Sequence, residues 1–561
     1  MSRATMSQVR GWDPAAAGIA SDAVVEGNLR FGGAMRAAGR HVDAAVSGWR
    51  GAAATAAALH ALSSQLTANH IGAAALDIAD ALADAAALAG VCATVRDIDD
   101  EAAANGCVIA DDGTVTAPHA DTGNAVLDLV LQACFDGKAL ALQARLLPLL
   151  DCAGETDQSI GKRLTAAVEA LVALRGAPQG GPISTRVAAV LDGDAFLPED
   201  PKALRALWES LAPADQDALF AFDPAIGNRD GIPAVARDCY NRMDLERLRA
   251  AAESDLRGLD AQHPDWARRE NLPDTAHDWI ALHRWDAERQ QIHTQLAAYT
   301  AAADAAGGAG RYLLGVDNDG HGAIALNNPD AASNIATFVP GTGASLDGIG
   351  TGTGRARALL AAATKADRSA RTSVIAWYGY ESPPGLGNAL SGRYADEGAV
   401  ALGRFESGLR ATHAGVPADL TVVGHSYGTT LMGIAAGHGN SLAADNLIFV
   451  GSPGVEVHGV SELRLDGIPV EHNHEHVYAT ADPADPVSFY ARWIHGTDPV
   501  DPDFGATVFP SAGAKLNLLL LHALPYGSLL PFDPWAHGNY WGNGNPGLET
   551  QGEIITGRYR P

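Results

Sequence analysis

The sequence is poor in the residues that several protein classes require. It has five cysteines in 561 residues and no CxxC pair, which excludes the common structural zinc patterns and a thioredoxin-like redox site. There are 39 Lys and Arg residues against 66 Asp and Glu, a formal charge of −27, so the chain lacks the basic surface of a sequence-independent nucleic-acid binder. Hydrophobic residues make up 47%, too many for a disordered chain. We therefore expect a folded, acidic protein that binds no nucleic acid.

Long apolar runs and an apolar leader are also missing. The nearest apolar run, Leu516 to Leu530, is too short for a bilayer and contains Pro525 and Gly527, so no transmembrane segment is expected. The first residues lack the apolar core of a secretory signal peptide. The cysteines are interpreted as buried thiols, although two pairs could close short loops in an oxidising compartment: Cys92 with Cys107, and Cys134 with Cys152.

Three compositions follow one another along the chain and predict three domains. Residues 1–115 are Ala-rich with helical spacing and one break, at Ser47–Gly51, between two long helices. Residues 116–306 are also mostly helical and contain the segment IGNRDGIPAVARDCYNR (226–242). The small-residue stretch AAADAAGGAG (301–310) predicts a flexible boundary before the third domain, residues 307–561.

In the third domain, short β-rich runs alternate with helical segments. An antiparallel hairpin is expected around Asn318-Asp319-Gly320. Five later runs are nearly continuously apolar, as in strands that a parallel sheet buries on both faces: NIATFVPG, SVIAWYGY, DLTVVGHS, NLIFVGSPG and HVYATAD. The alternation predicts an α/β fold, a mostly parallel sheet with helices on both faces, preceded by two all-helical regions.

The pentapeptide Gly424-His425-Ser426-Tyr427-Gly428 is the strongest chemical signal. It follows the strand run DLTVV and precedes the helical run TLMGIAAG, so the chain turns sharply and holds the serine in a strained conformation. The two glycines leave room for close packing, and the helix N-terminus adds a positive dipole end. An ordinary glycine turn could have the same sequence, so whether Ser426 is a nucleophile depends on whether the chain supplies an acid and a base for it.

Candidate partners follow in the order nucleophile, acid, base that this arrangement requires. Asp485 lies in the loop directly after HVYATAD, and His537 lies in the turn-rich segment WAHGNYWG. We predict that Ser426 is the nucleophile, Asp485 the residue that orients the imidazole, and His537 the base. The rivals that remain open are Asp482 for the acid, and His495 and His522 for the base.

An oxyanion hole needs two backbone N–H groups. One is expected from Tyr427, the residue after the nucleophile, and the other from Thr342 in the loop VPGTGA after the first central strand. Neither this loop nor GIGTGTG fits a nucleotide-binding glycine pattern, so no cofactor is expected. Three histidines before the last strand run would share one face if extended, as a metal site requires, but solvated histidines are the preferred interpretation: His472, His474 and His476.

These motifs resemble those of an actinobacterial α/β-hydrolase domain family of uncharacterised function, and they share elements with class 3 lipases. The shared elements are GHSYG, FVGSPGVEV, Asp485-Pro486-Val487 and His537-x-x-Tyr540-Trp541, and the segment 226–242 is a further element of the actinobacterial family. The resemblance covers residues 307–561 and implies a serine-hydrolase fold with a triad. It is this match that favours Asp485 and His537 over their rivals.

Trp49-Arg50-Gly51, at the break between the two N-terminal helices, resembles the WXG-type helical hairpin of type VII secretion substrates. That resemblance implies a helical partner protein. The usual Tyr-x-x-x-[Asp/Glu] signal after the second helix is absent, since Tyr240–Asp244 fits the letters but lies in a later region. A cytoplasmic location and type VII export both stay open. The alternative is a helical domain that packs on the hydrolase and controls access to it.

The sequence therefore predicts a serine esterase that cleaves lipid or other acyl esters through an acyl-Ser426 intermediate. The apolar residues between acid and base would either line or cover an acyl pocket or form a core helix: Leu518 to Leu521, Leu524, Leu529, Leu530, Phe532 and Trp535. A peptidase or thioesterase with the same triad is one alternative. A secretion-linked binding or structural protein with an inactive hydrolase fold is the other.

Overall fold

The structure is a computed structural model of the 561-residue chain, and it describes residues 3–46, 48–49, 51–176, 183–270, 272, 276–413, 415–490, 494–511 and 535–560. The chain forms two compact units, Met1–Gly181 and Pro182–Pro561. Their boundary coincides with neither of the domain boundaries expected from composition, after residues 115 and 306, and those boundaries stay predictions.

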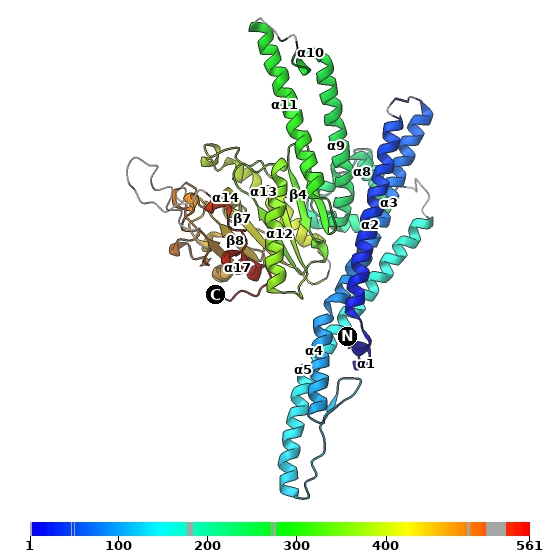
Figure 1. Ribbon diagram of the computed structural model, residues 1–561, viewed down its shortest axis with the longest axis vertical. Coiled ribbons are helices and arrows are strands. Elements are labelled where there is room, and N and C mark those ends of the chain that lie inside the picture. The colour runs from blue at the N-terminus through cyan, green and yellow to red at the C-terminus, as the bar shows by residue number, and fades with distance from the viewer. Residues whose placement is uncertain are drawn as a thin grey trace. The chain divides into compact units, whose positions relative to one another are not determined.

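The first unit is built from helices. Its elements are α1 (Met6–Gly11), α2 (Pro14–Val46), α3 (Ala52–Ala87), α4 (Ala89–Ala104), a short antiparallel pair of β1 (Val108–Ile109) and β2 (Val115–Thr116), and α5 (Ala125–Gly176). Helices α2 and α3 lie side by side and antiparallel (Figure 1), and the Ser21 hydroxyl donates to the Ala79 carbonyl at 2.7 Å. Small side chains allow this close approach, so the Ala-rich composition specifies a helical hairpin.

The hairpin turn itself is described only in part. Trp49 is 55% exposed, while Ser47 and Arg50 lie outside the described residues. By length and composition alone, the described stretch Ala52–Ala104 is long and apolar enough to cross a membrane, although no transmembrane segment was expected from the apolar runs in the sequence. Core helices of soluble proteins meet the same criteria, so we do not assign this stretch to a membrane.

All five cysteines are free. Cys92 and Cys107 are buried, as expected for structural thiols, and burial raises the pKa of Cys92. The expectation was wrong for Cys134 and Cys152, which are exposed on α5, because that helix turns only part of its surface towards the core of its unit.

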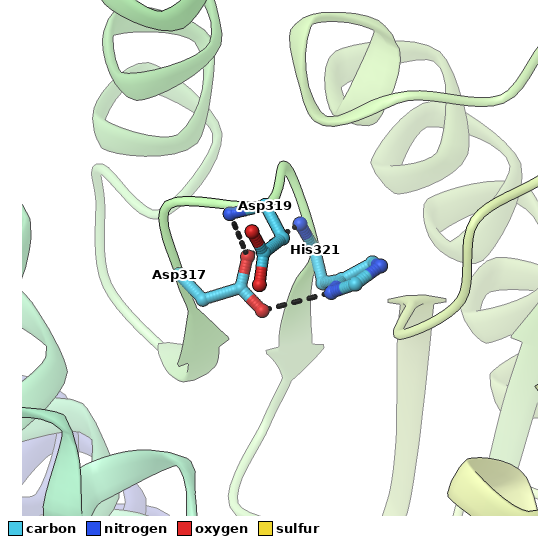
Figure 2. Close-up of side chains that lie close together, drawn as sticks. All are labelled: Asp317, Asp319 and His321. Carbon is cyan, nitrogen blue, oxygen red and sulfur yellow. Dashed lines mark hydrogen bonds and ion pairs between the residues drawn. The ribbon is translucent and has the colours of Figure 1, made fainter.

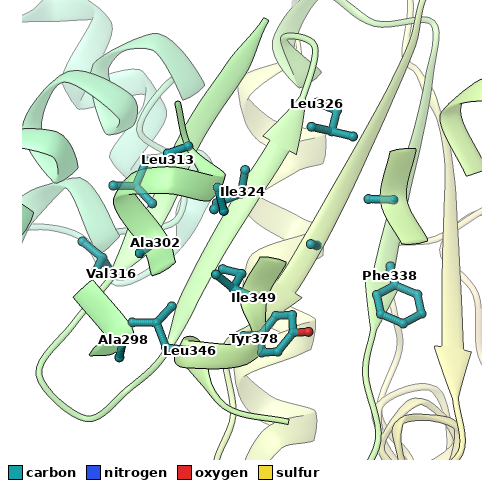
Figure 3. Close-up of a cluster of buried hydrophobic side chains, with 14 of the residues drawn as sticks. Ala298, Ala302, Leu313, Val316, Ile324, Leu326, Phe338, Leu346, Ile349 and Tyr378 are labelled. Atoms are coloured by element: carbon teal, nitrogen blue, oxygen red, sulfur yellow. The ribbon is translucent and has the colours of Figure 1, made fainter. Parts of the chain in front are cut away.

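The second unit begins with the helices α6 (Thr185–Leu191), α7 (Pro201–Ser210), α8 (Pro213–Phe222), η1 (Pro224–Asn228), α9 (Ala234–Gln262), α10 (Pro264–Ala267) and α11 (Ala276–Ala305). Helices α9 and α11 run side by side and are joined through α10 (Figure 1). The stretch 301–310 was expected to be a flexible boundary, and this was wrong. Ala302, near the end of α11, is buried against the sheet (Figure 3), and Ala306, just after the helix, is buried as well, because alanine allows helix and strands to approach closely.

An eight-stranded sheet follows, in the order β10-β9-β8-β7-β5-β6-β4-β3. Its strands are β3 (Arg311–Val316), β4 (Gly322–Leu326), β5 (Asn334–Val339), β6 (Thr372–Tyr378), β7 (Asp419–His425), β8 (Asn446–Val450), β9 (Val477–Thr480) and β10 (Thr507–Val508). The predicted hairpin is confirmed as β3 and β4, and the five apolar runs are confirmed as β5 to β9. The neighbours from β6 through β5 to β10 are parallel, while β4 is antiparallel to both of its neighbours.

Helices cover both faces of this sheet, as predicted for an α/β-hydrolase fold. Helices α12 (Ile349–Ala366) and α17 (Pro546–Ile555) pack together on one face, against side chains such as Phe338 and Val423. Helices α13 (Arg393–Thr412) and α14 (Tyr427–Ala436) pack together on the other face (Figure 1). The strand order reverses at β5, whose neighbours are β6 and β7. A crevice therefore opens at their carboxyl ends, where ligands bind in open α/β sheets.

The segment 226–242 closes the outer edge of β3, the last strand of the sheet. An unpaired edge exposes N–H and C=O groups to pairing with other chains. Side chains from η1 and α9 bond these groups instead: Asn228 to both the N–H and C=O of Val316 (2.9 and 2.7 Å), Asp238 to Leu313 N–H (2.6 Å), Asn241 to Leu313 C=O (3.0 Å) and Arg242 to Arg311 C=O (3.0 Å). The motif thus fastens the helices to the sheet.

Candidate active site

Ser426 stands at the sharp turn between β7 and α14. Its φ of 54° and ψ of −129° lie in a region that L-residues rarely adopt. A Cβ at Gly424 would collide with Met432, and one at Gly428 would lie 2.5 Å from the Val339 carbonyl oxygen. Both glycines are therefore required by close packing, as the pentapeptide predicted. The close packing around this turn keeps the serine in the strained conformation at the carboxyl end of the central strand.

The loop after β5 comes close to the same turn. A Cβ built on Gly341 would lie 2.7 Å from Ser426 Cβ and 3.1 Å from the Tyr427 nitrogen, so only glycine fits there. In this loop the N–H of Gly343 donates to Pro383 at 2.8 Å. Within the described residues, the N–H groups of Thr342 and Tyr427 donate to no backbone carbonyl. Both residues line the cavity that Ser426 lines.

Asp485 and His537 lie together although 52 positions separate them. His537 Nδ1 is 2.8 Å from Asp485 Oδ2. The carboxylate is fully buried and its other contacts hold it in place: Tyr540 Oη donates to Oδ2 at 2.6 Å, and the Val487 N–H donates to Oδ1 at 2.8 Å. Burial, followed by the nearby Asp485 charge, raises the pKa of Tyr540, so its hydroxyl remains a donor. In this geometry the Nδ1–H group of the imidazole donates to the Asp485 carboxylate, and Nε2 is left as a hydrogen-bond acceptor.

The three rival residues occupy other positions. Asp482 Oδ1 accepts from the Ala484 N–H at 2.9 Å, which shapes the turn that carries Asp485. His495 also lines the cavity, but its ring nitrogens contact Glu456 Oε1 at 2.8 Å and the Ala389 carbonyl at 2.6 Å. His522 lies outside the described residues.

Two further residues behind His537 were not singled out from the sequence. His425 Nε2 contacts the His537 carbonyl oxygen at 2.7 Å, and Arg355 Nη1 lies 3.4 Å from His425 Nδ1. Burial, together with the nearby charges of His537 and Arg355, holds the pKa of His425 well below its usual range, so this imidazole is neutral at physiological pH. No spacing pattern points to Arg355, because its partners come from β7 and from the loop after residue 534.

The cavity beside Ser426 has a volume of about 920 Å³ and is mostly apolar. Its described lining includes Ser426 and His537 together with Leu386, Leu390, Ile494 and Pro453. Of the apolar segment Leu518 to Trp535, expected to line or cover a pocket or form a core helix, residues 518–534 lie outside the described residues. Trp535 is 81% exposed and is not among the residues that line the cavity.

A second acidic cluster lies in the β3–β4 hairpin. Asp317, Asp319 and His321 each offer one ligand atom, and these atoms lie within 4.8 Å of one another (Figure 2). Asp317 already accepts from two backbone N–H groups at 2.9 Å and contacts His321 Nδ1 at 2.8 Å. These bonds account for the cluster as a hairpin turn, and we assign no metal to it. The histidine series 472–476 lies on η6 (Val470–His472) and α15 (Asn473–His476), not on an extended strand.

Comparison with known proteins places part of the second unit among the α/β hydrolases. Residues 317–493 match the model of an alpha/beta hydrolase family. Uncharacterized protein Rv2079 of Mycobacterium tuberculosis is 29% identical over 394 residues, which are 62% of this chain and 54% of the relative. Uncharacterized protein Mb0988c of Mycobacterium bovis is 35% identical over 92 residues, 16% of this chain and 34% of the relative.

The chain thus spans about half the length of the first of these relatives, and no solved structure is significantly similar to it. The mycobacterial relatives support the expected actinobacterial hydrolase family, whose members here are uncharacterised. The family match supports hydrolase activity.

Proposed function

We propose that this protein is a serine hydrolase that cleaves carboxylic esters, with Ser426 as nucleophile, His537 as general base and Asp485 as the residue that orients the base. The observation that carries the proposal is the 2.8 Å contact between His537 and Asp485 at the cavity that His537 shares with Ser426. Serine, carboxylate and imidazole in this order along an α/β chain are the arrangement of a nucleophile elbow with its acid and base.

The chemistry proceeds in two steps on these residues. His537 Nε2 takes the proton of Ser426 Oγ as the oxygen attacks the ester carbonyl, and Asp485 stabilises the imidazolium that forms. The N–H groups of Tyr427 and Thr342 donate to the oxyanion. His537 then protonates the leaving alcohol, and water hydrolyses the acyl-Ser426 ester by the same route. No cofactor enters either step.

The cavity favours esters with an apolar part. Side chains such as Leu386, Leu390 and Ile494 offer a surface for acyl carbons, and burial of each CH₂ contributes about 0.8 kcal/mol. A volume of about 920 Å³ is large enough for a chain of medium length. We therefore place lipid or other acyl esters ahead of peptides and thioesters.

The test is hydrolysis of p-nitrophenyl esters of increasing acyl length by the full chain and by Ser426→Ala. We expect turnover that Ser426→Ala lowers by at least about 10³-fold, with an unchanged melting temperature. A fluorophosphonate probe, followed by mass spectrometry of the peptides, should label Ser426 and no other residue.

The two readouts separate the alternatives. A labelled Ser426 without ester turnover would point to a peptidase or thioesterase, because the nucleophile would be active on another acyl group. A chain that is neither labelled nor active would be a hydrolase fold with a binding or structural role.

For the N-terminal unit we propose a helical hairpin that pairs with a second helical protein of the WXG type. The antiparallel packing of α2 and α3 and the exposed Trp49 support this proposal. The three-domain division at residues 115 and 306, and type VII export, remain proposals of the same kind.

A further inference from the structure

The charges around the cavity beside Ser426 are unbalanced. Among the described residues that line it there is no aspartate or glutamate, and Arg355 is its one lysine or arginine. The chain as a whole has a formal charge of −27, so the general field of the protein repels anions. A cation at this position is therefore a local exception.

Arg355 comes from α12 and its guanidinium is held between aromatic rings. It lies 4.8 Å from the centre of the Trp541 ring and 5.7 Å from that of Phe338. No carboxylate of the described chain lies within ion-pair distance of it, whereas Arg237 and Arg410 of the same unit each pair with an aspartate. Burial lowers the pKa of Arg355, yet a guanidinium remains charged at any physiological pH.

The neighbouring imidazole does not neutralise this charge. His425 Nε2 contacts the His537 carbonyl oxygen at 2.7 Å, a contact that requires the proton on Nε2. The Nδ1 atom of His425 then carries no proton, and its lone pair accepts a hydrogen bond from Arg355 Nη1 at 3.4 Å. This single long contact uses one of five guanidinium N–H groups.

A desolvated cation is costly unless an anion pairs with it. The guanidinium is a planar fork that suits the two oxygens of a carboxylate or phosphate. Since His425 precedes Ser426 directly and contacts Arg355, an anion bound there would lie in the same cavity as the scissile ester.

We propose that the cavity selects esters that carry a negatively charged oxygen group, and that Arg355 binds this group. The inference deepens the proposed esterase function by naming the substrate class: an ester with a carboxylate or phosphate in its acyl or its alcohol part. Arg355 is then the residue that determines specificity.

The test compares matched esters that differ by one carboxylate. For the acyl part, these are the p-nitrophenyl monoester of adipic acid and p-nitrophenyl hexanoate. For the alcohol part, they are a carboxy-substituted nitrophenyl hexanoate and the same p-nitrophenyl hexanoate. The quantity measured is the ratio of kcat/KM for the anionic and the neutral ester.

We expect the wild-type ratio to exceed one for at least one part of the ester, and Arg355→Gln to lower that ratio about tenfold or more. Arg355→Lys keeps the charge without the fork and should give an intermediate ratio, which also covers the case that the Gln variant folds poorly. Arg357→Gln is the matched control, since Arg357 is exposed on the same helix and does not line the cavity. A ratio that is the same in wild type, Arg355→Gln and Arg357→Gln overturns the proposal.

Binding provides a readout that does not depend on turnover. In the Ser426→Ala protein, adipic acid monoanilide should bind at least about tenfold tighter than hexananilide by calorimetry, and Arg355→Gln should abolish the difference. A charge preference in binding without ester turnover would support the anion site and overturn the proposed esterase function. Ester turnover with no charge preference in either assay would support the esterase function and overturn the anion site.

Discussion

Among the described residues of the second unit, two aspartate–histidine pairs have the same contact distance and very different surroundings. His537 Nδ1 to Asp485 Oδ2 and His321 Nδ1 to Asp317 Oδ2 both measure 2.8 Å. The Asp485 side chain is fully buried at the carboxyl end of the sheet, while that of Asp317 is 30% exposed in a hairpin turn (Figure 2). A contact distance therefore does not distinguish a catalytic pair from a structural one.

The difference lies in what surrounds each pair. Asp485 also accepts from Tyr540, from the Val487 N–H and, at 3.5 Å, from the Ser488 hydroxyl, and its histidine lines the cavity of Ser426. Asp317 instead closes the turn between two strands of the same hairpin. The hydrogen bond to Asp317 raises the pKa of His321, against the effect of burial. Burial would raise the pKa of Asp317, but the His321 contacts outweigh it and lower that pKa. The first pair has the surroundings that the proposed orientation of a base requires, and the second has those of a turn.

The largest expected effect separates the two aspartates. Asp485→Asn should lower kcat by about 10³–10⁴-fold, because an amide at this position favours the wrong imidazole tautomer. Asp317→Asn makes the same chemical change in the second pair and should leave kcat within about twofold. Ester hydrolysis at pH 8 measures both.

Asp482→Asn completes this set as the control for the neighbouring aspartate, since its Oδ1 contact with the Ala484 N–H survives in the amide. If Asp482→Asn, and not Asp485→Asn, abolished turnover, the assignment of the acid would be wrong.

A smaller effect is expected at Tyr540, the partner that Asp317 lacks. Tyr540→Phe removes the 2.6 Å hydrogen bond to Asp485 and should lower kcat about tenfold with little change in KM. The pH–rate profile should shift as well, because the carboxylate loses a donor and the imidazolium becomes more stable. Tyr478→Phe is the control, since the Tyr478 hydroxyl bonds the Glu475 carbonyl outside the cavity. Equal losses in both variants would indicate a general packing effect.

The smallest effect concerns the pH dependence of stability at His321. Its pKa is raised in the folded state, so its stabilising contribution is complete below the unfolded pKa of about 6.5 and is lost as pH rises through the folded value. His321→Gln should therefore lower the melting temperature by about 1 °C near pH 6 and hardly at all near pH 9, since a partly exposed pair contributes at most about 0.5 kcal/mol.

As pH falls through the lowered pKa of Asp317, the difference between wild type and His321→Gln should vanish again. Thermal scans of both proteins from pH 3 to 9 measure it. A difference that grew towards alkaline pH would contradict the assigned ion pair.

Much of the fold could be predicted because its signals are local. The strands β5 to β9 are continuous apolar runs, and Ser426 lies between a strand and a helix that adjoin it in the sequence. The segment 301–310 was misjudged for the complementary reason. Alanine and glycine are as suited to a tight helix–sheet contact as to a linker, and only the packing of Ala302 and Ala306 distinguishes them.

The residues of the candidate site that belong to a sequence motif could be predicted, and the contacts between distant residues could not. Asp485 and Asp482 stand three positions apart in one loop, and spacing does not decide between them. The structure shows contacts between residues far apart in the sequence. His537 contacts Asp485, 52 positions away, and His425 contacts Arg355, 70 positions away. Such pairs have no periodicity that a single sequence could reveal.

The class of fold, the sharp turn at Ser426 and the helical character of the N-terminal half follow from the sequence, because propensity, periodicity and turn chemistry act between near neighbours. Three other features are visible only in the folded chain: the contact of His537 with Asp485, the hydrogen bonds of the segment 226–242 to the edge of β3, and the position of Arg355 at the cavity of Ser426 without a carboxylate among the described residues. Those outcomes depend on which chain segments the sheet brings together, and this is set by the packing of the whole domain.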